Sequence, residues 1–118
     1  MAIKINGELG DVFVDNTVIA RIAGQVANKC YGVVGMAARS KRDGIVSLLK
    51  PNSMTKGIQV DVENAGIVIT LSIIVEYGVN INVISESIMK NVRYTIEKVT
   101  GLQVNRVFVK VEDIRVDE

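Results

Sequence analysis

The stretch from Ile67 to Tyr77, which reads IVITLSIIVEY, decides the fold of this chain. Every second side chain in it is apolar or aromatic, as in a β-strand with one face turned towards a core. The intervening positions include Val68 and Ile74, so the opposite face is partly apolar as well. A strand that is apolar on both faces is typical of the interior of a sheet. The sequence therefore predicts that residues 67–77 form the central strand.

Four further strands are expected around this central one. Residues 58–63 alternate cleanly between apolar and polar side chains, and the three residues after them suit a short hairpin connection. Shorter strands are expected at residues 8–14 and 33–37. A final strand begins at Val107, and its alternation changes phase near Asp113, which indicates a bulge or a strand end there.

Two amphipathic helices are predicted by apolar residues that recur every three or four positions. One follows the first strand, and its apolar stripe runs from Val18 to Cys30. The other follows the central strand, with a stripe from Ile84 to Val99. Asp15 or Asn16 is the candidate N-terminal cap of the first helix, and Gly32 is its candidate stop. For the second helix the candidate cap is Asn80 or Asn82, and the candidate stop is Gly101.

These elements follow one another in the order β-α-β-β-β-α-β. Two amphipathic helices and a small, mainly antiparallel sheet predict an α+β fold, a two-layer sandwich with both helices packed on the sheet. The length of 118 residues suits one core, so we expect a single domain over residues 1–118.

The composition excludes several classes of chemistry. The chain has no histidine and no tryptophan, and Cys30 is its only cysteine. Ser-His-Asp and Cys-His catalysis, histidine-ligated zinc and an internal disulfide are therefore absent, and Cys30 is expected to be a buried thiol on the apolar stripe. We predict no enzyme activity, no catalytic residue, no metal and no cofactor. The chain has 14 Lys and Arg residues and 13 Asp and Glu residues, so its net charge is only +1 and its overall electrostatic field is weak. This charge disfavours a strongly basic nucleic-acid binder.

The most polarised segment is a long basic loop at about residues 38–57. A connection of this length is often functional. Within it, residues 45–49 are expected to form one helical turn, either as an apolar anchor or tucked under the sheet. Two interpretations of the segment stay open. It contacts phosphates, anionic lipid head groups or an acidic partner, or it is a solvated loop whose charges only keep the protein soluble. Its basic residues are Arg39, Lys41, Arg42, Lys50 and Lys56, against one acid, Asp43.

The expected location is the cytoplasm. The N-terminus lacks the apolar stretch of a signal peptide. The longest apolar-rich run, residues 67–75, is far shorter than the ~20 residues that span a bilayer. We expect any membrane contact to be peripheral or through a partner.

The turn Gly32-Val33-Val34-Gly35 leaves a nucleic-acid interpretation open. A GxxG turn clamps the nucleic-acid backbone in KH domains. This turn holds no Lys or Arg, and a helix stop followed by a strand-edge glycine explains it more simply.

Three segments together resemble the alkaline shock protein family, the Gls-type envelope stress response proteins of Gram-positive bacteria. They are GDVFVDNTVIARIA at residues 10–23, GVVG at residues 32–35 and VTGLQVNRVFVKV at residues 99–111. The resemblance covers roughly residues 7–116. Cys30 and Tyr31 stand where the family often has a glutamate and a proline.

The resemblance implies a small non-enzymatic protein of envelope homeostasis that other proteins recruit to the membrane. The family supplies no catalytic residues to carry over. Protein partners, some of them membrane-associated, and self-association are expected, and no small-molecule substrate is evident. The leading hypothesis is therefore a protein-interaction or scaffold module. A small nucleic-acid-binding module and a regulatory partner of a lipid-metabolism kinase stay open as alternatives.

Overall fold

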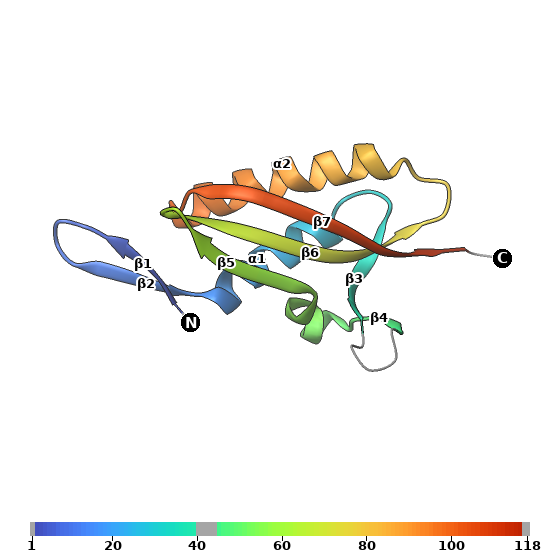
Figure 1. Cartoon of the computed structure of the whole chain (residues 1–118), viewed down its shortest axis with the longest axis horizontal. Coiled ribbons are helices and arrows are strands. Elements are labelled where there is room, and N and C mark those ends of the chain that lie inside the picture. The colour runs from blue at the N-terminus through green and yellow to red at the C-terminus, as the bar shows by residue number, and fades with distance from the viewer. Residues whose placement is uncertain (1, 40–44, 117–118) are drawn as a thin grey trace.

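A computed structural model describes residues 2–39 and 45–116 (Figure 1). Its elements, in chain order, are β1 (Ala2–Asn6), β2 (Asp11–Asp15), α1 (Asn16–Asn28), β3 (Val33–Arg39), β4 (Val46–Leu48), the 3-10 helix η1 (Pro51–Gly57), β5 (Ile58–Glu63), β6 (Gly66–Glu76), α2 (Ile81–Thr100) and β7 (Val104–Arg115).

Strand β6 lies at the centre of the main sheet, as predicted. Along one edge it pairs with β7 in parallel. Along the other edge it pairs antiparallel with β5 over its first half and with β3 over its second half. β4 extends the sheet by pairing antiparallel with β3. The predicted α+β fold with a mainly antiparallel sheet is therefore confirmed, and the single parallel pair arises because α2 crosses over from β6 to β7.

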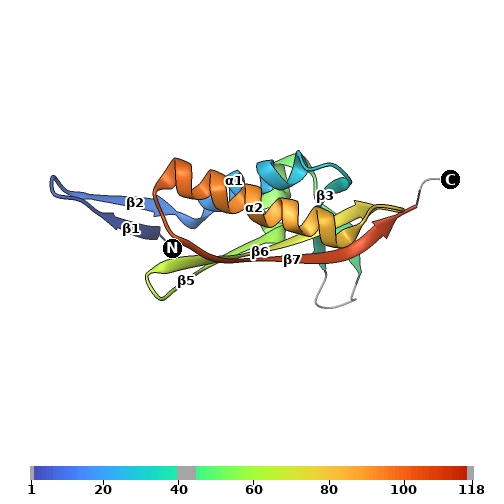
Figure 2. The ribbon, with the colours of Figure 1, turned by 90° about the horizontal axis from the view of Figure 1, so that it is seen from above.

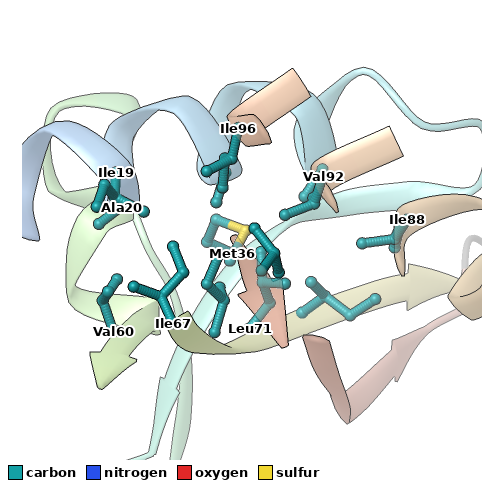
Figure 3. Packing of buried hydrophobic residues seen from close by; sticks show 14 of the residues in the cluster. Ile19, Ala20, Met36, Val60, Ile67, Leu71, Ile88, Val92 and Ile96 are labelled. Atoms are coloured by element: carbon teal, nitrogen blue, oxygen red, sulfur yellow. The ribbon is translucent and has the colours of Figure 1, made fainter. Parts of the chain in front are cut away.

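Both helices cover the same face of the sheet, which gives the two predicted layers (Figure 2). The core lies between these layers and consists mainly of aliphatic side chains from β6, α1 and α2, with Met36 of β3 and Val60 of β5 among them (Figure 3). On β6 the inward side chains are Ile67, Ile69, Leu71, Ile73 and Val75, which are essentially inaccessible to solvent. On α2 they are Ile84, Ile88, Val92 and Ile96.

The helix termini follow the predicted caps with one exception. The Asp15 carboxylate accepts a hydrogen bond of 2.8 Å from the Thr17 N–H, and the Asn80 side chain caps α2. Gly101 ends α2 in the left-handed conformation, with φ 74°. The predicted role of Gly32 as the stop of α1 is wrong: the helix ends at Asn28, and Gly32, with φ 87°, forms the turn into β3.

The N-terminal strand prediction needs correction. The structure contains a hairpin of two strands, β1 and β2, where we expected one strand at residues 8–14. Residues 7–10 form its turn, in which the Gly7 N–H donates to the Gly10 carbonyl at 2.9 Å. β1 is only five residues long, and pairing with β2 rather than a long periodic pattern makes it a strand.

The predicted helical turn at residues 45–49 is also wrong. Val46–Leu48 forms β4, with Val46 opposite Arg39 and Leu48 opposite Ala37. The β-branched residues Ile45 and Val46 favour an extended backbone, and the edge of β3 offers hydrogen bonds that a single helical turn would lack.

The predicted irregularity near Asp113 is a β-bulge. Val111 pairs with Ile73, but the next residue of β6, Ile74, pairs with Asp113. One extra residue, Glu112, is therefore accommodated in β7, which explains the change of phase. The hairpin between β5 and β6 turns through Asn64 and Ala65, which both have positive φ values, as a two-residue primed turn requires.

Truncation of Leu71 tests the assignment of the core. Leu71→Ala removes a fully buried side chain from the central strand and should lower the free energy of unfolding by about 2–5 kcal/mol. Val62→Ala, at a β5 side chain that is 56% exposed, is the control and should cost less than about 1 kcal/mol. Urea unfolding followed by circular dichroism measures both values, and equal losses would contradict the described core.

The Asp15 cap should make stability depend on pH. Hydrogen bonds from the Thr17 N–H and hydroxyl hold the pKa of the Asp15 carboxyl below its usual range. The stabilisation is therefore present above the ordinary carboxyl pKa of about 4 and is lost as the pH falls through the lowered value. Asp15→Asn keeps an acceptor oxygen that does not titrate, so its urea midpoint should fall less than that of the unaltered chain between pH 5 and pH 2.

Glu86→Gln removes one exposed carboxylate from α2 and serves as the control for this pH experiment. It should retain the pH dependence of the unaltered chain. If Asp15→Asn retains it too, the cap does not contribute to the pH dependence.

Candidate interaction surfaces

The three predicted basic residues that the structure describes lie at separate places along the segment. Arg39 is the last residue of β3, whereas Lys50 precedes η1. Since the Leu49 N–H donates to the Met36 carbonyl at 2.9 Å, Lys50 lies at the opposite end of the β3–β4 pair from Arg39. Lys56 is exposed in the last turn of η1. The two remaining predicted residues, Lys41 and Arg42, lie outside the described residues.

A second basic cluster, which the sequence did not reveal, lies between α2 and β7. Lys90 and Arg93, three positions apart on α2, face Arg106 of β7 across a groove of about 390 Å³. Its floor and walls are apolar and come from Met89, Val107 and Phe108. The i, i+3 spacing of the two helical cations is visible in the sequence, but their approach to Arg106 depends on the return of β7 beneath α2.

The charge of this α2–β7 groove is only partly compensated. Arg93 Nε lies 3.8 Å from Glu97 Oε1, in an exposed ion pair. The other oxygen of Glu97 accepts a hydrogen bond of 3.0 Å from the Val104 N–H and so holds the start of β7 against α2. Three cations and one nearby carboxylate leave the groove positive.

The β1–β2 hairpin projects from the body of the molecule (Figures 1 and 2). It contributes to an elongated shape of 57 × 31 × 24 Å. Ile3 and Val14, which pair across its two strands, pack against the core and anchor its base. Further out, Phe13 is 66% exposed and Leu9, in the turn, is fully exposed.

Strand edges also border the main sheet, among them those of β7 and β5. β7 pairs with β6 alone among the described strands, so its outer edge has no strand beside it there. The outer edge of β5 is partly covered, because the Asn16 side chain donates a hydrogen bond of 3.4 Å to the Val60 carbonyl. Free edges of this kind are sites at which another chain can add a strand.

The GxxG turn has a structural explanation. It leads from a helix into a strand, and a Cβ at Gly32 would lie 2.5 Å from Ile84 Cδ1. At Gly35 a Cβ would lie 2.9 Å from Leu48 Cδ1. The positive φ of Gly32, 87°, favours glycine there, and a side chain at either position would displace the end of a neighbouring aliphatic side chain. The turn joins α1 to β3, so a KH-type clamp between two helices is not formed.

Cys30 is half-buried rather than fully buried. Its thiol donates a hydrogen bond of 3.4 Å to the Val26 carbonyl. In the part of the chain that the structure describes, no three Cys, Asp or Glu residues gather where they would hold a metal ion. No described helix is both long and apolar enough to cross a membrane.

Comparisons with known proteins support the resemblance drawn from the sequence. The model of the alkaline shock protein 23 family, described as having a cell envelope-related function, matches residues 4–116. The chain is 36% identical to YloU of Bacillus subtilis and 35% identical to Spy1614 of Streptococcus pyogenes, and each match covers 98% of this chain and at least 97% of the relative.

A stress response regulator gls24 homolog of Streptococcus pyogenes is 28% identical over 92% of this chain and 61% of its own length. Among solved structures, a variant of MamM CTD superposes with a TM-score of 0.54 at 13% identity, over 86% of this chain and 94% of that one, which is a likeness of fold alone. The family model and the relatives agree over nearly the whole chain, so this chain belongs to the alkaline shock protein 23 family of cell envelope-related proteins.

Proposed function

We propose that this chain is a non-enzymatic protein-interaction and scaffold module that partners recruit in cell-envelope homeostasis. The projecting β1–β2 hairpin, with apolar side chains exposed to solvent, is the observation that carries the proposal. Monomeric domains seldom leave such surfaces uncovered, and exposed apolar patches mark contact sites. Membership of a family with an envelope-related function supplies the biological setting.

Recruitment by protein contact also agrees with the kind of surface the chain offers. The α2–β7 groove is apolar with a basic rim, and the neighbouring outer edge of β7 is long, from Val104 to Arg115. Grooves and strand edges of this kind bind peptides and other domains. The proposed location is the cytoplasm, with peripheral membrane contact made through a partner.

The basic segment of residues 39–56 is proposed to provide the electrostatic part of partner binding. A local excess of positive charge in a chain of net charge +1 attracts acidic surfaces over about a Debye length, and salt weakens this attraction. Its members are Arg39, Lys41, Arg42, Lys50 and Lys56.

Neutralisation of three of these residues tests the proposed electrostatic contact. The triple variant Arg39→Ser, Lys41→Ser and Arg42→Ser should bind partners from a membrane fraction about five- to tenfold more weakly at low salt, and its binding should depend less on salt. Capture of co-purifying proteins by the tagged full chain at several salt concentrations, quantified by mass spectrometry, measures the effect.

A second triple variant provides a matched control. Arg21→Ser, Lys29→Ser and Lys98→Ser remove the same charge from exposed positions on the helices or at a helix end and should leave capture unchanged. Equal capture by the basic-segment variant would overturn the assignment of that segment. Loss of the captured proteins after nuclease treatment would replace the proposal with nucleic-acid binding, and a lipid-metabolism kinase as the main partner would establish the regulatory alternative.

A further inference from the structure

We propose that the β1–β2 hairpin of one copy inserts into the α2–β7 groove of a second copy. This inference deepens the proposed interaction function, on which it rests, by naming the two surfaces that meet and the partner that supplies one of them.

The hairpin has the features of an arm that requires a partner. An isolated two-stranded hairpin is marginally stable in water. The base of this hairpin is held by Ile3 and Val14, but Val12, one step further out on the same face, is 58% exposed, and Leu9 at the tip is fully exposed. A second apolar surface beneath the outer half would remove these side chains from water.

The groove offers an apolar surface of suitable size. Its volume of about 390 Å³ falls within the range of protein pockets that hold ligands, which is about 300–1,000 Å³. Phe108 on its wall is 45% exposed, so its ring is available to pack against an incoming apolar side chain. Leu9 protrudes furthest at the hairpin turn and is the side chain proposed to enter the groove.

The charges of the two surfaces are opposite. Residues 2–15, which form the hairpin, contain one basic residue and three acidic residues, a net charge of −2. The groove has three cations and the neighbouring Glu97, a net charge of +2. Glu8, adjacent to Leu9, would therefore reach the rim of the groove among basic groups. The existing ion pair of Asp11 with Lys4, 3.4 Å long, is exposed and weak enough to exchange partners.

The position of the hairpin favours contact with a second copy over contact within one chain. The hairpin points away from the helices and the sheet (Figures 1 and 2). The groove is lined by residues of α2 and β7. The two surfaces that meet are different, so the contact is head-to-tail, and a pair of copies retains one free arm and one free groove. Repeated from copy to copy in the same direction, such contacts build rings or open chains.

Sedimentation velocity of the purified full chain over a range of concentrations tests this arrangement. The arm variant is Glu8→Lys with Leu9→Ser, and the groove variant is Arg106→Glu. The unaltered chain should form a concentration-dependent series of oligomers at low salt, and each variant alone should sediment as a monomer.

An equimolar mixture of the two variants provides the decisive measurement. The arm variant keeps an intact groove and the groove variant keeps an intact arm, so the mixture should form a heterodimer and nothing larger. Absence of the heterodimer, persistent oligomers of either variant, or a monomeric unaltered chain at every concentration would overturn the inference.

Two controls keep the outcomes interpretable. Lys29→Glu with Tyr31→Ser changes a charge and an exposed apolar side chain away from both surfaces and should associate like the unaltered chain. Circular dichroism and thermal unfolding should show that every variant is folded. Partner capture from the membrane fraction is a separate measurement: if capture persists while self-association is absent, the hairpin contact fails and the proposed function stands.

Discussion

The structure depends on the pairing of β6 along both of its edges. β7 occupies one edge over almost its whole length, and β5 and β3 divide the other. This arrangement leaves the helix-facing side chains of β6 fully inside the core, where each large aliphatic side chain contributes about 1.5–3 kcal/mol. Both helices cover this strand, so its burial determines where every other element lies.

The elements with long, regular periodicity could be predicted from the sequence. The alternation of residues 67–77 and the three- and four-residue steps of the α2 stripe both persist over many positions, so chance matches are few. β1 and β4 are five and three residues long, too short for a pattern, and pairing with the strand next to them in the chain makes them strands. Gly32 was predicted as the stop of α1, but it lies in the turn into β3, where it packs beside Val79 and Ile84 from a distant part of the chain.

The candidate surfaces also differ in whether they could be predicted from the sequence. The basic segment is contiguous in sequence, so Arg39 and its neighbours could be identified by charge counting alone. The α2–β7 groove joins residues separated by the end of α2 and the turn into β7, and only the parallel pairing of β6 with β7 returns Arg106 to the neighbourhood of Lys90. No local property of Phe108 distinguishes a groove residue from any other strand residue, because its role follows from the chain fold.

The separation of these surfaces has a consequence for binding strength. Among the described residues, the proposed arm and groove lie apart from Lys50 and Lys56, so a head-to-tail assembly would leave these basic residues exposed on every copy. Several weak basic contacts displayed together bind a surface far more tightly than one, because each bound copy raises the effective concentration of the next. A net charge of only +1 per copy keeps repulsion between neighbours small while the local charges stay separate. Assembly and recruitment would then reinforce each other, since a surface that concentrates the chain also promotes the contact between its copies.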